Sequence, residues 1–343
     1  MTRVAAIDCG TNTIRLLIAE AHCDDSGRPR LEVLRRRNEI VRLGQGVDRT
    51  GLLDPEALER TLAAVASYAA DCTELGVAPG GDARRFVATS ATRDARNRED
   101  FVAGVRRLLG IEPEVVSGQE EARLSFTGSL LGARGAADTP APGRGECAPA
   151  PRLVVDLGGG STELVLGVDA PSAAISLDTG SVRITERFLA GGVTPEAEAA
   201  ARAEVRGLLD EAERVVDLSA PGRLIGLAGT ITTVTAHALD LQAFDPRALN
   251  GAELSPQAVL ASCEAIVHST AEQRASWGYL APGRRDVIAA GALVWSEVVT
   301  RVVERTTAGG RPLAHVTTSL YDILDGIALS LVPDPGPAEG ARA

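Results

Sequence analysis

The sequence predicts an α/β protein built from two duplicated halves, with a binding cleft between them. Three observations support this prediction. Short apolar runs typical of buried strands alternate with segments of helical periodicity along most of the chain. One strand-turn-strand pattern occurs twice, near the N-terminus and again 148 residues later. The length of 343 residues also favours two domains over one.

The first half alternates strands and helices. Residues 4–7 and 14–19 are expected to be strands, joined by a turn that contains Gly10. A helix is expected to begin after Asp54, because Asp is favoured at the N-cap and Pro55 at the first helical position. The pattern then predicts a strand at 85–89, a helix at 100–109, a strand at 114–116 and a helix at about 119–131.

Residues 132–152 interrupt this pattern. They are rich in Gly, Pro and Ala and show no periodicity, as in a flexible surface loop. The loop divides the chain into an expected N-terminal domain at residues 1–131 and an expected C-terminal domain at residues 153–332. Residues 333–343 are expected to form a frayed tail.

The second half repeats the alternation. Strands are expected at 153–156, 162–167, 174–177, 224–227 and 314–317. Helices are expected to begin near residues 182, 195, 231, 256 and 285, two of them at Thr-Pro or Ser-Pro starts. The last helix, at about 319–331, can pack back on the first domain.

The repeated pattern matches residues by chemical type. In each half an apolar strand ends in Asp, a turn with Gly follows, and a hydroxyl residue precedes a second apolar strand. Two unrelated hairpins would not be expected to keep all three in register, so a duplication is favoured. The matched pairs are Asp8 and Asp156, Gly10 and Gly158, and Thr13 and Ser161.

Composition excludes several classes of protein. With 46 acidic and 35 basic residues the net charge is −11, so no nucleic-acid partner is expected. The chain has no lysine, which excludes a phosphate loop of the Walker type. Five cysteines without a C-x-x-C pair indicate neither a disulfide framework nor a structural zinc site. No bilayer-spanning segment and no signal peptide are recognised, so no membrane partner and a cytoplasmic location are expected.

The repeated turns are candidates for phosphate binding. Consecutive backbone N–H groups in a glycine-containing turn form a concave site for phosphate oxygens, and two such turns can hold one phosphate between them. A third candidate is Gly229-Thr230, at the start of a helix. Tight turns without a ligand are the structural alternative. The candidate residues in the two repeated turns are Gly10, Thr11, Asn12, Thr13, Gly158, Gly159, Gly160 and Ser161.

The acidic residues at the two strand ends suit a divalent cation. Asp8 and Asp156 each end a strand immediately before one of the turns. Mg²⁺ usually takes only one or two protein carboxylates, directly or through water. We therefore expect Mg²⁺, or Mn²⁺, at this position.

Five segments resemble, in their sequence, order and spacing, those of the exopolyphosphatase/guanosine pentaphosphate phosphohydrolase family. They are residues 8–15 (DCGTNTIR), 88–93 (ATSATR), 117–122 (SGQEEA), 156–163 (DLGGGSTE) and 229–230 (GT). The resemblance extends from Val4 to about Leu331, as in the short members that lack C-terminal helical domains. It implies an actin, sugar-kinase and Hsp70-like fold. It also implies an enzyme that releases terminal phosphate from inorganic polyphosphate, guanosine pentaphosphate, or both.

The same resemblance implies roles for individual residues. Glu121 would be the general base that deprotonates the attacking water, and Arg93 would bind phosphate. Asp156 and Glu163, with Asp8, would hold the metal ion. Taken alone, a Glu in the first turn of a helix is ordinary, because the helix dipole favours it there.

Two other functions are compatible with the sequence. One is a nucleotide- or polyphosphate-binding regulator with little turnover. The other is a sugar or acetate kinase of the same fold, against which the short chain and the SGQEEA string argue. The three arginines at 35–37 are either solvated surface or a landing strip for a polyanion. The oligomeric state stays open, a homodimer included.

Overall fold

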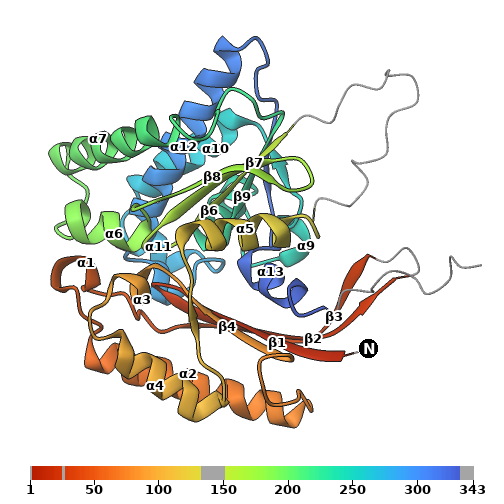
Figure 1. Ribbon diagram of the computed structural model, residues 1–343. Coiled ribbons are helices and arrows are strands. Elements are labelled where there is room, and N and C mark those ends of the chain that lie inside the picture. Colours follow the sequence, from red (N-terminus) through yellow and green to blue (C-terminus); the bar gives the residue numbers. More distant parts are fainter. Residues whose placement is uncertain (1, 25–27, 133–150, 333–343) are drawn as a thin grey trace, which may run out of the picture.

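The computed structural model describes residues 2–24, 28–132 and 151–332. Most of the predicted loop at 132–152 and the whole predicted tail at 333–343 lie outside the described residues. Two mixed β-sheets lie one above the other, with helices between them and on their outer faces (Figure 1). No helix among the described residues is long and apolar enough to cross a membrane.

The first sheet has the strand order β3-β2-β1-β4-β5. In it, β2 pairs antiparallel with β1 and β3, whereas β4 and β5 extend the sheet in parallel with β1. Its strands are β1 (Thr2–Cys9), β2 (Thr13–Cys23), β3 (Pro29–Ile40), β4 (Arg84–Ala88) and β5 (Glu114–Val115).

The second sheet repeats this topology in the order β10-β11-β9-β6-β7-β8. Here β7 pairs antiparallel with β6 and β8, while β9 and β11 run parallel with β6, and β10 is an additional edge strand. Its strands are β6 (Arg152–Leu157), β7 (Thr162–Gly167), β8 (Pro171–Leu177), β9 (Arg223–Leu227), β10 (Glu253–Leu254) and β11 (Val316–Thr318).

Amphipathic helices cover the outer face of each sheet. α2 (Pro55–Glu74) begins as expected, with the Asp54 side chain accepting from the N–H of Ala57, and α4 (Arg98–Leu109) ends at a left-handed Gly110. Both pack on the first sheet in a core that contains Tyr68 and Phe101. The second sheet is covered around Trp295 by α7 (Pro195–Ala212), α10 (Pro256–Val267) and α12 (Ile288–Ala308).

Short helical segments connect these elements. The predicted helix near residue 182 is a short α-helix that continues as a π-helical turn. The segments are α1 (Val47–Thr50), α3 (Ser90–Asp94), α6 (Ser181–Ile184) with its π-helical turn Thr185–Leu189, α8 (Ala228–Ala238), α9 (Pro246–Leu249), α11 (Ala271–Ser276) and the 3₁₀ turn Pro282–Arg284.

Two helices, α5 (Gly118–Ser129) and α13 (Ile323–Leu329), lie between the sheets and are exchanged between the halves (Figure 1). α5 follows the first sheet in the chain, yet its Phe126 packs against Val154 and Val165 of the second. α13 follows the second sheet, and its Ile327 packs in a cluster with Leu17 of the first. Each of these helices thus packs with the half of the protein that does not precede it in the chain. The division of the chain at residues 131 and 153 therefore stays a prediction.

The two central helices touch backbone to backbone. A Cβ on Gly128 of α5 would lie 1.8 Å from the carbonyl oxygen of Asp322. One on Gly326 of α13 would lie 2.0 Å from the carbonyl oxygen of Leu124. Both distances are shorter than any van der Waals contact, so the helix spacing depends on these two glycines.

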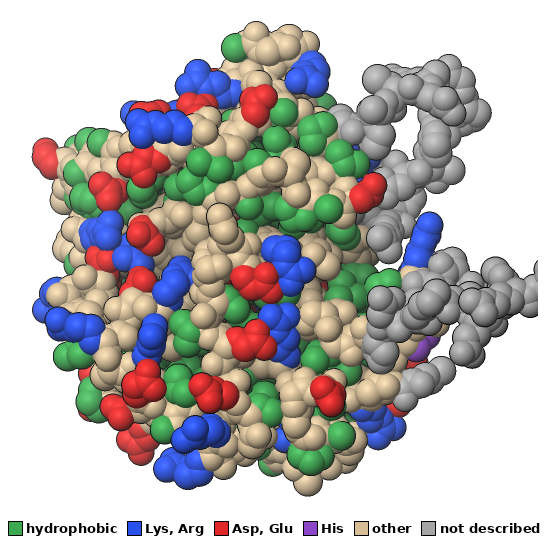
Figure 2. All heavy atoms as spheres, viewed as in Figure 1, with side chains coloured by type: hydrophobic (Ala, Val, Ile, Leu, Met, Phe, Trp, Pro, Cys, Tyr) green, Lys and Arg blue, Asp and Glu red, His purple; other side chains and the backbone are tan. Residues whose placement is uncertain are grey.

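Strand β3 carries the arginines at 35–37 and was not predicted as a strand. Its polar sequence has no apolar alternation, because it lies at the edge of the sheet. Arg35 and Arg37 donate to Asp71 of α2 at 2.5 and 2.6 Å, and Arg36 pairs with Asp325 of α13. The run therefore forms ion pairs with α2 and α13, and its contact with a polyanion stays a prediction. On the face shown in Figure 2, arginine and acidic side chains are interspersed.

The helix contact makes a prediction about stability. Gly326→Ala should lower the free energy of unfolding by about 1–3 kcal/mol, because the new methyl group overlaps the backbone of α5. Gly207 of α7 is a matched control, since a Cβ there meets no atom within 4 Å. Gly207→Ala should instead stabilise the protein by up to about 1 kcal/mol through helix propensity. Urea unfolding of both variants measures this, and an equal effect of the two substitutions would contradict it.

Candidate active site

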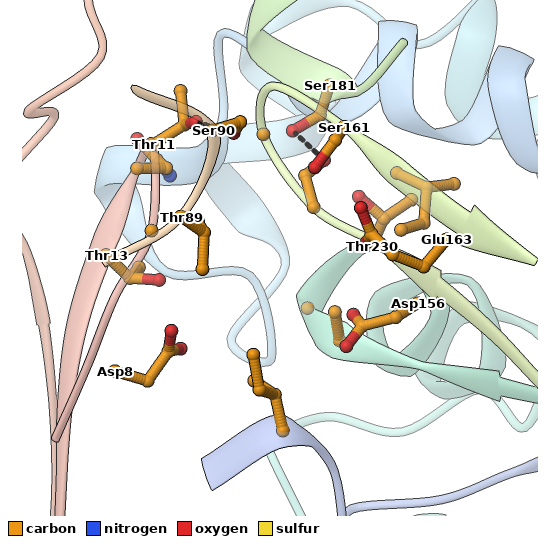
Figure 3. Close-up of a pocket in the computed structure, with 18 of the residues that line it drawn as sticks. Asp8, Thr11, Thr13, Thr89, Ser90, Asp156, Ser161, Glu163, Ser181 and Thr230 are labelled. Carbon is orange, nitrogen blue, oxygen red and sulfur yellow. Dashed lines mark hydrogen bonds between the residues drawn. The ribbon is translucent and has the colours of Figure 1, made fainter. Parts of the chain in front are cut away.

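The turns that follow β1 and β6 face each other across a pocket of about 90 Å³ between the sheets. Asp8 projects into it from the first half and Asp156 from the second (Figure 3). All predicted site residues except Arg93 and Gly160 line this pocket. They are Asp8, Gly10, Thr11, Asn12, Thr13, Glu121, Asp156, Gly158, Gly159, Ser161, Glu163, Gly229 and Thr230.

Both turns are closed by the same backbone hydrogen bond. The N–H of Gly10 donates to the carbonyl of Thr13 at 2.9 Å, and the N–H of Gly158 donates to that of Ser161 at 3.0 Å. The repeat in the sequence is therefore also a repeat of backbone geometry. These two N–H groups are used inside the turns, so their glycines shape the turns instead of offering donors to a ligand.

Other N–H groups of the turns are available to an anion. Thr11, Asn12 and Gly159 line the pocket, and their backbone N–H groups donate to no acceptor in the described part of the chain. Backbone N–H groups are strong donors that rarely stay unpaired away from water. Their grouping on opposite walls suits the oxygens of a phosphate group.

The two predicted residues outside the lining have other contacts. A Cβ on Gly160 would lie 2.6 Å from Thr11 Oγ1 and 2.7 Å from Ser90 Oγ, so this glycine permits the two halves to approach. Arg93 donates from Nη1 to Glu121 Oε2 at 3.2 Å and to the carbonyl of Val116 at 3.0 Å. Arg93 is therefore beside Glu121, and its contact with phosphate stays a prediction.

The two copies of the repeat differ in the charge of one residue. Asp8 lies opposite Arg15 in the strand register, whereas Asp156 lies opposite Glu163. Arg15 donates to Asp8 Oδ2 from Nε at 2.9 Å and from Nη2 at 2.5 Å, and it also pairs with Asp322 at the start of α13. The charge of Asp8 is thus already compensated, while Asp156 meets a second acid.

Asp156 and Glu163 are buried, and within the described residues they accept hydrogen bonds from serine hydroxyls. Ser125 donates to Asp156 at 2.6 Å and Ser176 to Glu163 at 2.7 Å. Burial, followed by the charge of Asp322, raises the pKa of Asp156 to about 6. Burial, followed by the charge of Asp156, raises the pKa of Glu163. A bound cation would favour ionisation of both.

Glu121 differs sharply from its neighbour Glu120. The Ser117 side chain caps α5, which places both residues in the first turn of the helix. Glu121 is buried, and burial followed by the charge of Glu163 raises its pKa well above the usual range, against the opposing charge of Arg93. Glu120 is bound by Arg123 at 2.7 Å, which lowers its pKa. Only Glu121 of the two lines the pocket.

Several pocket residues were not predicted from the sequence. Arg15 could have been found, because it lies 148 residues before Glu163 and so occupies the equivalent position of the repeat. Arg284 is the last residue of a 3₁₀ turn far along the chain, and no sequence signal identifies it. The other unpredicted polar lining residues are Thr89, Ser90 and Ser181.

The carboxylates fit a divalent cation that keeps part of its water shell. Among the described residues, the only three-residue group close enough to form a ready-made metal site is Glu198, Glu264 and His268. It lies outside the pocket, and Arg202 already binds both of its carboxylates at 2.8 and 2.7 Å. The acids of the pocket do not form such a close group of three. This agrees with Mg²⁺ held by one or two carboxylates, water and phosphate.

Comparisons with known proteins agree with this geometry. The Ppx/GppA phosphatase family matches residues 21–308. Exopolyphosphatase 2 of Mycobacterium tuberculosis is 44% identical over 339 residues, which cover 96% of this chain and 99% of the relative. A solved exopolyphosphatase-like protein is 41% identical with a TM-score of 0.83, covering 96% of this chain and 97% of its own. The Aquifex aeolicus member of the Ppx/GppA family is 26% identical with a TM-score of 0.72, at the same coverage.

The predicted fold class, two duplicated actin-like α/β units with a cleft between them, is confirmed by these neighbours and by the two sheets. The chain therefore belongs to the Ppx/GppA phosphatase family and is a hydrolase of phosphoanhydride bonds of that family's type.

Proposed function

We propose that this protein releases terminal phosphate from inorganic polyphosphate or guanosine pentaphosphate, with Glu121 as the general base. One observation supports this most directly: a buried glutamate lines the same pocket as two opposed turns with unpaired N–H groups. The name of the 44% identical relative, an exopolyphosphatase, favours inorganic polyphosphate. Guanosine pentaphosphate rests on the resemblance of the five sequence segments alone.

The terminal phosphate would lie between the two turns. The N–H groups of Thr11, Asn12 and Gly159 would donate to its oxygens, and the hydroxyls of Thr13, Ser161 and Thr230 lie around the same space. Gly229 would contribute from the first turn of α8, near the positive end of the helix dipole. Phosphoanhydride hydrolysis proceeds through a loose transition state, so positioning and charge stabilisation account for most of the catalysis.

Glu121 would accept the proton of the attacking water. A carboxylate with a raised pKa is a stronger base than an exposed one, provided that it is ionised. Arg93 supports the ionised form by its contact at 3.2 Å, and it fixes the direction of the carboxylate. Arg93 would also attract the phosphate oxygens, since a guanidinium can donate to several oxygens at once.

Asp156 and Glu163 are the residues best suited to hold the cation. Neither has an ion-pair partner among the described residues, and both are buried at the pocket wall. Asp8 would contribute less, because Arg15 already compensates its charge. Bound there, Mg²⁺ or Mn²⁺ would neutralise charge on the phosphate oxygens. The cytoplasmic location and the homodimer stay predictions.

The substrate is tested by a phosphate-release assay with long polyphosphate, short polyphosphate and guanosine pentaphosphate. Phosphate release from the two polyphosphates is expected. The rates with polyphosphate, compared with the rate with guanosine pentaphosphate, show which substrate the enzyme prefers. Tight binding of all three without release would overturn the proposal in favour of a regulator with little turnover.

Glu121→Gln should lower kcat by roughly 10²–10⁴-fold, the usual contribution of a general base. The substitution keeps the size of the side chain, so the melting temperature should change little or rise, because a buried charge is removed. Glu120→Gln is the matched control at the adjacent position and should lose far less activity. The measurement is steady-state phosphate release together with a thermal melt. Similar small losses in both variants would falsify the assignment of Glu121.

The buried acids predict how pH and metal act on stability. Because the folded pKa values of Asp156 and Glu163 are raised, the folded state binds more protons than the unfolded state above about pH 4. Their contribution to stability is therefore lost as the pH rises. Because of these two groups, the metal-free protein should have a lower melting temperature at about pH 8 than at about pH 5.5. Mg²⁺ should raise the melting temperature more at the higher pH.

Glu163→Gln isolates this effect, since it removes one titrating group from the pair. It should reduce both the pH dependence and the Mg²⁺-induced shift in melting temperature. Glu198→Gln, in the surface cluster with Arg202, should leave both unchanged. Chelation with EDTA should abolish phosphate release, and Mg²⁺ should restore it. Full activity in EDTA, with a Mg²⁺ shift that Glu163→Gln does not reduce, would show that the metal assignment is wrong.

A further inference from the structure

The pocket between the sheets adjoins two other cavities. The large cavity, of about 690 Å³, meets the pocket at Arg15, Ala228, Gly229 and Arg284. There the guanidinium of Arg284 lies against the backbone of Gly229. The small cavity, of about 140 Å³, meets the pocket at Thr11, Asn12 and Val287. Since no described residue lines both the large and the small cavity, they adjoin the pocket on different sides.

The two cavities differ in the sign of their charge. Five arginines and one acid line the large cavity, and two of these arginines, Arg247 and Arg284, have no ion-pair partner among the described residues. One arginine and two acids line the small cavity. Its arginine, Arg42, pairs with Asp286, which leaves Glu186 as the acid without a cation partner in the described part of the chain. The large cavity therefore attracts a polyanion, whereas the small cavity does not retain one.

Hydrolysis of a phosphate chain leaves two anions side by side. Water oxygen bonds to the terminal phosphorus, the bond to the bridging oxygen breaks, and its electron pair stays on the shortened chain. Inorganic phosphate then lies between the two turns, and the chain lies towards the arginines of the large cavity. The two anions repel each other at this short distance. A chain that stays bound also obstructs the way out through the large cavity.

The wall of the small cavity contains an ion pair between the two halves. Arg42, which follows β3, reaches Asp286, which precedes α12, with one nitrogen at 2.8 Å and another at 2.9 Å. The two side chains are 33% and 50% exposed, so water weakens the pair and it opens easily. The exposed Gln45 lines the same cavity, which therefore reaches the surface.

The same arginine is also attached to one of the two turns. Its N–H donates to the carbonyl of Asn12 at 3.0 Å. Arg42 has a backbone φ of 54°, which is uncommon for a residue other than glycine and persists only where neighbouring contacts hold it. One residue thus connects the turn beside the proposed phosphate position with the opposite half of the protein.

We propose that the small cavity is the exit for inorganic phosphate, and that Arg42 and Asp286 form its gate. This rests on the proposed function. When the pair opens, the freed guanidinium draws phosphate past Asn12, and the negative charge of Glu186 keeps it from staying. The chain remains on the side of the large cavity. Because entrance and exit are separate, the next hydrolysis can begin without release of the chain.

The first test blocks the exit. Gln45→Trp places a large side chain at the mouth of the small cavity and removes no hydrogen bond between described residues. It should lower the steady-state release of phosphate from tripolyphosphate by roughly 10-fold, because product release becomes limiting. The first turnover, measured after rapid acid quenching, should stay as fast as in the wild type. Total phosphate should therefore show an initial burst that free phosphate does not show.

Gln257→Trp is the matched control. Gln257 is exposed on α10 and lines none of the three cavities, so this variant should behave like the wild type. A thermal melt of both variants checks that they are folded. Unchanged steady-state release in Gln45→Trp, or an equal loss in its first turnover and its steady state, would overturn the proposal.

The second test opens the gate and needs no turnover. Arg42→Met combined with Asp286→Asn removes both partners of the pair and leaves the net charge of the small cavity unchanged. Phosphorus NMR of inorganic phosphate, with Mg²⁺ present, measures how fast phosphate exchanges between the protein and solution. Exchange should be faster in this double variant and slower in Gln45→Trp.

An exchange rate that neither variant changes would mean that phosphate leaves through the large cavity, and the proposed exit would be wrong. The two proposals fail separately. If the wild type releases no phosphate from tripolyphosphate or from longer chains, the proposed function fails. The exchange of inorganic phosphate still decides which cavity it passes through.

Discussion

The contact between α5 and α13 sets the distance between the two sheets, and the site depends on that distance. Gly128 and Gly326 allow the helix backbones to touch, so the spacing cannot relax without separating the halves. The same two helices begin at the pocket. The first turn of α5 carries Glu121, and Asp322 at the start of α13 holds Arg15. A packing contact in the centre of the molecule thus positions a proposed base on one helix and an ion pair on the other.

The duplication supplies symmetric turns, and a single difference between the copies makes the site asymmetric. Both turns close with the same hydrogen bond, and both follow an aspartate. The residue opposite the aspartate is Arg15 in one half and Glu163 in the other. One wall therefore pairs its aspartate with an arginine, and the other places two acids side by side. Such a pair of walls can accept a phosphate and a cation together, which a strictly symmetric pair of acids would not favour.

The sequence predicted those parts of the site that depend on local pattern. The repeat located both turns and both aspartates, and the five family-like segments located Glu121, Glu163 and Arg93. It did not predict β3, because an edge strand bound by ion pairs needs no apolar alternation. It also missed the exchange of α5 and α13 and the place of Arg284 in the pocket. These depend on contacts between residues far apart in the chain, which no local periodicity encodes.

The close approach of Gly229 and Arg284 constrains the order in which these positions can change during evolution. Any larger residue at 229 forces the guanidinium of Arg284 to move, because Nη1 lies 1.4 Å from the site of the new Cβ. Loss of the arginine removes that barrier, after which position 229 can drift. A relative with a larger residue at 229 is therefore expected to lack the arginine at 284 or to hold its side chain in another position.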